Sequence, residues 1–188
     1  MFRRLIMASM ASALSLMAIS AAPVTAAHAG QQYVDESGFA VSGYDPVAFF
    51  ELQQAPLGTR QPRAVPGRAD ITAEYNGAKW AFATEANRKA FLADPAKYAP
   101  AYDGHCAYGI SQGGKVPGNP NLWRIVDGRL YLNITPTVVG FWESDIPGNL
   151  DKSKVNWGKL EAAEASGKNW TAIDDNKGTY RDLAPVRN

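Results

Sequence analysis

The sequence predicts an α+β domain built from small antiparallel β-hairpins packed with short helices. Two runs of β-branched and aromatic residues are each divided by a two-residue turn signal, Asn76-Gly77 in the first and Asp127-Gly128 in the second. Short helical stretches with capping residues are interleaved with these hairpins, which is typical of a small α+β domain. Nothing in this order indicates a parallel, doubly wound sheet.

Residues 1–29 have the three parts of a secretory signal peptide. A basic start at Arg3 and Arg4 precedes an uncharged apolar run, and Ala27-His28-Ala29 supplies a small-residue cleavage motif. The run is rich in Ala and Ser and ends at this motif, which favours a removable leader over a membrane anchor. We therefore expect cleavage after Ala29 and a periplasmic or secreted chain without a membrane anchor.

Removal of this leader changes the set of reactive groups. All four Met lie at positions 1–17 and His28 also leaves, so His105 becomes the only histidine, beside the single Cys106. The basic residues fall from 19 to 17 against 18 acidic ones, which gives no electrostatic reason to expect nucleic acid or an anionic membrane as partner. A single Cys cannot form an internal disulfide.

The remaining length predicts one domain over residues 30–160, followed by a polar C-terminal extension at 161–188. Residues 38–50 fit a short strand, a Gly turn and a helix start, where Asp45 is a good N-cap. Residues 55–69 hold three Pro, two Gly and three Arg, which predicts a surface loop. The first predicted hairpin follows this loop and spans residues 70–83.

A helical stretch is expected at 84–100. Thr84 can cap its start, Asp94-Pro95 restarts a short second helix, and Pro100 ends it. The pattern therefore predicts two short consecutive helices. The apolar side is expected to consist of Ala86, Ala90, Phe91 and Leu92.

The second predicted hairpin spans residues 121–134, and Thr135-Pro136 then caps a further helix. Residues 146–166 predict another helix. The polar tail after Ser166 is expected to be ordered only in part, held by Trp170 and Tyr180. No internal repeat is visible in the sequence, although the cap-then-proline helix start recurs. The inward residues of the last helix are expected to be Leu150, Val155 and Trp157.

Four stretches resemble, in this order, the exported bacterial branch of the YHS-domain family. They are AVSGYDPVAFF, EYNGAKWAFATEANRKAFLADPAKYAPAYDGHCAYG, LWRIVDGRLYLN and FWESDIPGNLDKSKVNW, and they run from about Phe39 to Trp157. The resemblance implies a YHS/TRASH-like fold, in a group whose members bind heavy metals through cysteines. The stretches that correspond to those cysteines, YDPVAFF and WAFATEANRKAF, contain none, so the family's ligand set cannot be carried over.

The stretch YDGHCAYG (102–109) supports three interpretations. A transition-metal site for copper or zinc would use Cys106, His105 and the nearby Asp103. A reactive thiol would use Cys106 at a helix start beside the His105 imidazole, a setting that lowers the pKa of a thiol. In the third interpretation Cys106 packs as a small apolar residue and His105 turns to solvent.

A small-molecule site is the other candidate. A carboxylate beside an aromatic ring is a common ligand anchor, and Tyr44-Asp45 has this arrangement, although helix capping also explains Asp45. Tyr102 and Tyr108 flank Cys106 and complete the candidate ligand-binding residues. We therefore predict non-enzymatic binding of a transition-metal ion or small ligand near Cys106. The alternatives are a thiol-dependent or redox enzyme that uses Cys106 with His105, and a protein-interaction module.

Overall fold

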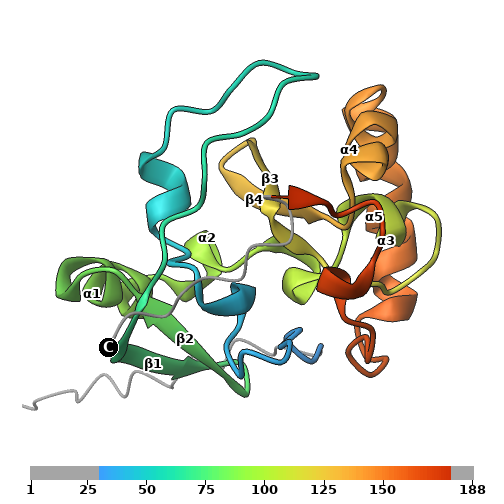
Figure 1. Cartoon of the computed structure of the whole chain (residues 1–188). Coiled ribbons are helices and arrows are strands. Elements are labelled where there is room, and N and C mark those ends of the chain that lie inside the picture. Colours follow the sequence, from blue (N-terminus) through green and yellow to red (C-terminus); the bar gives the residue numbers. More distant parts are fainter. Residues whose placement is uncertain (1–29, 179–188) are drawn as a thin grey trace, which may run out of the picture.

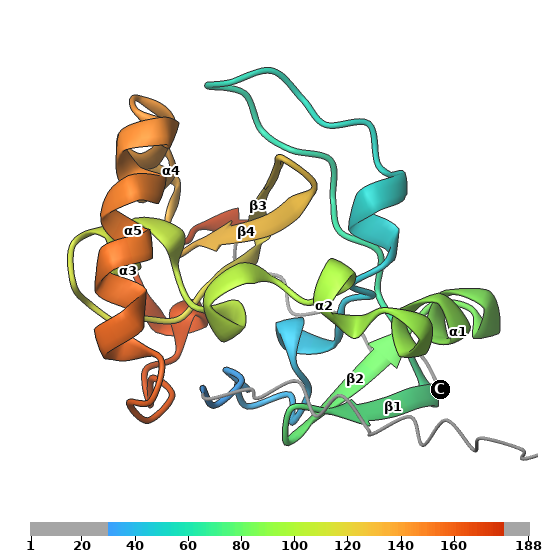
Figure 2. The ribbon, with the colours of Figure 1, turned by 180° about the vertical axis from the view of Figure 1, so that it is seen from behind.

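Figure 1 shows the computed structural model of the chain, which describes residues 30–178; the predicted leader, 1–29, and Tyr180 lie outside this range. The described residues form two antiparallel, two-stranded sheets with short helices, which confirms the α+β prediction. The first hairpin and the helix after it lie at one end of the molecule (Figures 1 and 2). The helices that follow the second hairpin lie at the other end, and the second hairpin lies between the two ends (Figures 1 and 2). No helix within residues 30–178 is long and apolar enough to cross a bilayer.

The first hairpin joins β1 (Arg68–Tyr75) to β2 (Ala78–Phe82) through the predicted turn at Asn76-Gly77. Both turn residues have positive φ, at 50° and 68°, as a two-residue turn of this kind requires. The preceding stretch 52–67 contains no helix or extended strand and forms a long excursion, seen in teal in Figure 1. It confirms the predicted surface loop.

Helix α1 (Glu85–Ala93) and the short α2 (Pro95–Tyr98) confirm the helical stretch predicted after Thr84. The predicted apolar side is wrong for Ala86 and Leu92, which are exposed. The buried residues of α1 are Asn87 and Phe91, which lie four positions apart and therefore share one face. Burial of the polar Asn87 follows from a hydrogen bond that its side chain makes to a buried carboxylate, described below.

The second hairpin joins β3 (Asn119–Val126) to β4 (Arg129–Asn133) through the predicted Asp127-Gly128 turn. Helix α4 (Pro136–Glu143) begins at Thr135, whose side chain accepts a hydrogen bond from a backbone N–H of the first turn. The longer α5 (Ile146–Leu160) follows directly. Both helices were expected from the sequence.

Helix α5 contacts the short α3 (Ala107–Ser111) through polar side chains. Its buried residues are Asn149 and Ser153, and the Ser153 hydroxyl donates to the Ala107 carbonyl at 3.2 Å. The prediction that Val155 faces inward is wrong, because this side chain is 65% exposed. The apolar pattern predicted the wrong inward face here, because α5 packs against α3 through hydrogen bonds between polar groups. The other two residues predicted to face inward, Leu150 and Trp157, are partly buried.

The structure contains an internal repeat that is not visible in the sequence. In the first hairpin Arg68 pairs with Phe82, and in the second Asn119 pairs with Asn133, an offset of 51 residues. In both hairpins the pairing register shifts after this first pair, and the pairs beyond the shift keep the offset of 51 residues. Two residues after each hairpin a threonine caps a helix, Thr84 for α1 and Thr135 for α4.

The repeat extends to the turns that precede the hairpins. The 3-10 turns η1 (Val41–Gly43) and η3 (Ala101–Gly104) each hold two non-Gly residues with positive φ before a glycine. The second residue after this glycine is Asp45 in one repeat and Cys106 in the other, and its backbone N–H donates to a valine carbonyl. Cys106 is therefore the structural counterpart of Asp45. Tyr44 forms an isolated β-bridge with Pro66 in the first repeat, and His105 forms the matching bridge with Pro117 in the second.

The fully buried carboxylate of Asp45 joins three segments of the first repeat. Its Oδ1 accepts from the backbone N–H groups of Val47 and Ala48 at 2.9 and 3.3 Å. The predicted helix with Asp45 as its N-cap is a short 3-10 turn that begins at Ala48 with Val47 as its N-cap residue. Asp45 Oδ2 accepts from the Ala83 N–H at 2.8 Å and from Asn87 Nδ2 at 2.7 Å. The side chain thus binds the η1 segment to the end of β2 and to α1.

The hydrophobic core lies between the two hairpins. Phe49, in the 3-10 turn η2 (Ala48–Glu51), is fully buried, and its ring lies 5.4 Å from that of Trp123 in an edge-to-face contact. Such pairs add stabilisation beyond the area they bury. The buried cluster around this contact also includes Tyr44, Trp80, Phe82, Phe91, Leu130 and Leu132.

The C-terminal segment packs back on the start of the chain. Trp170, in the 3-10 turn η4 (Trp170–Ala172), is fully buried, and its Nε1 lies 3.2 Å from both Asp35 Oδ2 and Ser42 Oγ. Asn176 is also buried and donates to the Trp170 carbonyl at 2.8 Å. Trp170 thus holds the tail, as predicted, and the packed segment includes Asn176.

We predict that Asp45→Ala lowers the free energy of unfolding by at least about 3 kcal/mol, because it leaves several buried N–H donors without an acceptor. Chemical denaturation followed by tryptophan fluorescence measures this loss. Asp94→Ala is the matched control, because Asp94 is an exposed cap of α2. Its loss should lower the free energy of unfolding by about 1 kcal/mol. Equal losses for the two variants would contradict the joining role of Asp45.

Candidate functional site

Cys106 and His105 lie at the junction between η3 and α3, and both are fully buried. Cys106 occupies the N-cap position of α3, where its Sγ accepts a hydrogen bond from the Gly109 N–H at 3.3 Å. The thiol also donates to Asn133 Oδ1 at 3.5 Å. The side chain therefore acts as a cap that ties α3 to the end of β4.

Burial raises the pKa of the Cys106 thiol to about 11. Hydrogen bonds from neighbouring backbone groups act in the opposite direction, but desolvation of the thiolate is the larger effect. The expectation that the helix start lowers this pKa is wrong, because α3 is only five residues long and the thiol is shielded from water. Cys106 is therefore a protonated thiol at neutral pH.

Both ring nitrogens of His105 have partners. Nδ1 lies 2.8 Å from the Tyr102 carbonyl, and Nε2 accepts from the Ser166 N–H at 3.1 Å. The neutral tautomer with the proton on Nδ1 satisfies both contacts. Burial lowers the pKa of His105 to about 4. The interpretation that His105 turns to solvent is wrong, because the C-terminal segment covers it through Ser166.

The predicted metal ligands do not form a coordination group. Within residues 30–178, no three His, Cys, Asp or Glu side chains are close enough together to hold a metal ion. The lone pair of His105 Nε2 is already used, and Cys106 would have to lose its proton in an apolar setting. Asp103 instead lies in η3 with a φ of 51°, and the backbone N–H of Tyr33 donates to its carbonyl at 2.8 Å.

Of the four predicted ligand-binding residues, only Tyr102 lines one of the two cavities described here. Asp45 is committed to the hydrogen bonds described above, and the Tyr44 hydroxyl lies 3.3 Å from Asn121 Oδ1. Tyr108 is half-buried, and its backbone N–H donates to Asn133 Oδ1 at 3.1 Å. Tyr102 lines a cavity of about 160 Å³ together with Asp103, Tyr75, Trp157 and Arg129.

A second cavity, of about 210 Å³, lies between β3, α4 and the long loop. None of the predicted site residues lines it. Two of its wall residues nevertheless contact them, because Asn133 binds Cys106 and Asn121 binds Tyr44. A single residue, Asn133, therefore separates the cavity from Cys106, the residue on which the sequence analysis focused. Its other walls include Gln61, Trp123, Arg124, Pro136, Val139, Gly140 and Glu143.

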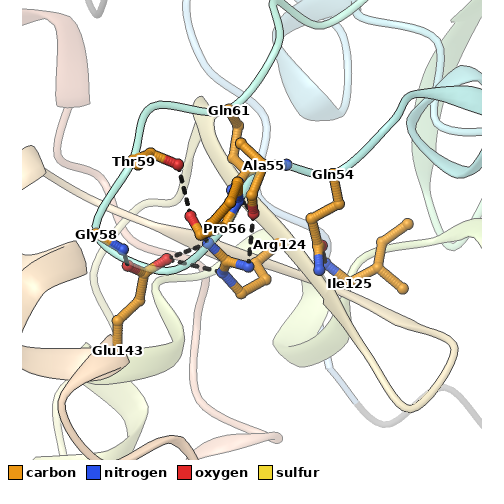
Figure 3. A network of polar contacts seen from close by, with 9 residues as sticks. All are labelled: Gln54, Ala55, Pro56, Gly58, Thr59, Gln61, Arg124, Ile125 and Glu143. Carbon is orange, nitrogen blue, oxygen red and sulfur yellow. Dashed lines mark hydrogen bonds and ion pairs between the residues drawn. The ribbon is translucent and has the colours of Figure 1, made fainter.

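A buried ion pair between Arg124 of β3 and Glu143 of α4 forms part of this cavity (Figure 3). The guanidinium Nε donates to Glu143 Oε1 at 2.7 Å, and the two side chains are 6% and 8% exposed. Charged side chains are rarely buried to this extent unless they are paired. The sequence signal for it was weak: a lone Arg in the apolar strand LWRIV, with its partner 19 positions later.

The same ion pair holds the long loop through backbone groups only (Figure 3). Arg124 donates to the carbonyls of Ala55 and Pro56 at 3.2 Å each, and Glu143 Oε2 accepts from the Gly58 N–H at 2.7 Å. All of these contacts are independent of the loop's side chains. The loop therefore forms a fixed wall over the cavity.

Comparison with known families identifies part of the chain. The model of the YHS domain matches residues 62–102, which contain the first hairpin, α1 and α2. A YHS domain suggests a metal-binding type of domain. The match ends four residues before Cys106 and contains neither cysteine nor histidine. No curated protein and no solved structure matches the chain.

The buried His105 should make stability depend on pH. Its pKa is about 4 in the folded chain, lower than the ordinary value of 6.5. Its contribution to the free energy of unfolding is therefore complete above pH 6.5 and is lost as pH falls toward 4. Between pH 7 and 5 we expect the wild type to lose about 2 kcal/mol of unfolding free energy more than His105→Gln loses. Urea denaturation at both pH values measures this difference, and parallel losses in the two proteins would refute it.

Proposed function

We propose that this chain is an exported, non-enzymatic binding protein whose small ligand occupies the cavity between β3, α4 and the long loop, near Cys106. The observation that carries the proposal is a preformed cavity of about 210 Å³ beside a buried ion pair. Such a concave site with a few fixed polar groups is the usual form of a small-molecule site. Export with cleavage after Ala29 remains part of the proposal on the strength of the leader sequence.

The lining of the cavity favours a small polar ligand. Asn121 and Asn133 contribute amide groups, while Pro136 and Val139 contribute apolar surface. Arg124 and Glu143 neutralise each other, so the ion pair supplies no net charge for attraction of an ion. Hydrogen bonding to amides, rather than charge, would therefore set specificity.

A copper or zinc ion at Cys106 is the competing candidate, and the match to the metal-binding type of domain is what favours it. The geometry favours the small ligand, because the thiol is protonated and the neighbouring imidazole is fully hydrogen-bonded. The same facts argue against a thiol-dependent or redox enzyme that uses Cys106 with His105, since neither a thiolate nor a free base is present.

A side chain added at the exposed edge of the cavity should weaken ligand binding without loss of fold. Gly140 lines the cavity, and a Cβ placed there meets nothing within 4 Å, so Gly140→Leu should be accepted by α4. The matched control is Gly158→Leu in α5, where a Cβ also meets open space. Each change should leave stability unchanged or raise it by up to about 1 kcal/mol, as expected when glycine is replaced inside a helix.

A library of small polar fragments, screened by NMR chemical shifts, is the readout for these variants. We expect fragments that shift the side-chain amides of Asn121 and Asn133 in the wild type and in Gly158→Leu, but not in Gly140→Leu. Fragments that bind all three proteins alike, or that shift only other surfaces, would refute the proposed site.

Native mass spectrometry after copper or zinc loading separates the two candidates. We expect the same metal stoichiometry for the wild type and Cys106→Ala, because the thiol is protonated and already bonded. Loss of one bound ion in Cys106→Ala, with Gly140→Leu unchanged, would favour the metal site over the small-ligand site.

A further inference from the structure

The first described residue, Gly30, is buried against the carboxylate of Asp103. A methyl group built on Gly30 would overlap Asp103 Oδ2 and lie 3.0 Å from the Glu161 carbonyl oxygen. Only glycine fits this position without a shift of its surroundings. Standard bond lengths then place the Gly30 nitrogen within about 4.5 Å of Asp103 Oδ2, whatever its direction.

The neighbouring residues fix this arrangement. The backbone N–H of Tyr33 and the side-chain amide of Gln32 both donate to the Asp103 carbonyl, at 2.8 and 2.9 Å. Asn76 Nδ2 lies 3.4 Å from Asp103 Oδ1. Asp103 itself has a φ of 51° in η3. The backbone of Asp103 is therefore positioned by its own turn and by the N-terminal segment, and its carboxylate contacts the first hairpin.

We propose that Asp103 is the binding site for the α-ammonium group that leader removal creates on Gly30. Hydrolysis of the Ala29–Gly30 bond consumes one water, leaves a carboxylate on Ala29 and leaves an ammonium on Gly30. The nitrogen changes from a neutral amide with one donor to a cation with three. Asp103 Oδ2 is the acceptor nearest to the Cβ position of Gly30, and the Glu161 carbonyl oxygen is the next.

The other charged groups around Asp103 are compatible with this pair. Lys115 Nζ donates to the Glu161 carbonyl at 3.1 Å, but a carbonyl oxygen has two lone pairs and can accept a second donor. Arg129, Tyr75 and the Glu161 side chain line the same cavity as Asp103. A partly buried ammonium–carboxylate pair is screened less by water and salt than a surface pair. The pair should therefore contribute measurably to stability.

The pair also bears on the region around Cys106. The segment that starts at Gly30 includes Tyr33, whose ring contacts that of His105 edge to face at 5.7 Å. Anchoring of the first residue would hold this cover in place over the buried imidazole. Leader removal would then complete the fold, and the precursor would be the less stable form.

The test is a double-mutant cycle between the N-terminus and Asp103. Three forms of the chain are compared: one that begins at Gly30, one that begins at Ala29, and one that begins at an Nα-acetylated Gly30. Each is made with Asp103 and with Asp103→Asn, and folding equilibrium constants are measured by urea denaturation. Glu161→Gln is the control, because it removes the neighbouring carboxylate and keeps the backbone carbonyl.

With Asp103 present, the form that begins at Gly30 should fold with an equilibrium constant about tenfold larger than the other two, a difference of about 1.4 kcal/mol. Asp103→Asn should abolish this difference, and Glu161→Gln should preserve it. The mass of the exported protein should correspond to residues 30–188. A difference that persists in Asp103→Asn, equal stability of the three forms, or a mature chain that begins elsewhere would overturn the proposal.

Discussion

The fold depends on one buried position that occurs twice, the second residue after the glycine of each left-handed turn. In the first repeat this residue is Asp45, whose carboxylate accepts hydrogen bonds from its own turn, from the end of β2 and from Asn87 of α1. A carboxylate that is buried away from water is stable only when several hydrogen-bond donors surround it. Because those donors come from separate segments, Asp45 fixes how the turn, the hairpin and the helix sit against one another.

The repeat changes how Cys106 is understood. It occupies the position of Asp45 in the second repeat, and like Asp45 it accepts a hydrogen bond from the N–H three residues later, here that of Gly109. Unlike the carboxylate, the thiol also donates, to Asn133 Oδ1. A neutral thiol costs little to bury, which suits a position with fewer donors than Asp45 has. One of the features that made Cys106 look reactive, its place at a helix start, follows from this capping role.

Local chemistry made much of the fold predictable. Asn76-Gly77 and Asp127-Gly128 located both hairpins, and Thr84 and Thr135 located two helix starts, because each acts on its immediate neighbours. Long-range contacts were not predictable. Burial of His105 depends on Ser166, 61 positions away, and the Arg124–Glu143 pair depends on how β3 meets α4. The repeat escaped detection because its equivalent positions share backbone geometry while their side chains differ.

The candidate cavity arises where the two repeats differ. The Asp45 N–H bonds to Val65, which follows by 20 residues, whereas the Cys106 N–H bonds to Val116, which follows by 10. The extra length in the first repeat forms the loop that crosses to the second repeat and binds Arg124 and Glu143 there. This loop supplies the wall of the cavity that faces β3 and α4. The two repeats thus differ in their loops, and only the longer one reaches across to the ion pair of the other repeat.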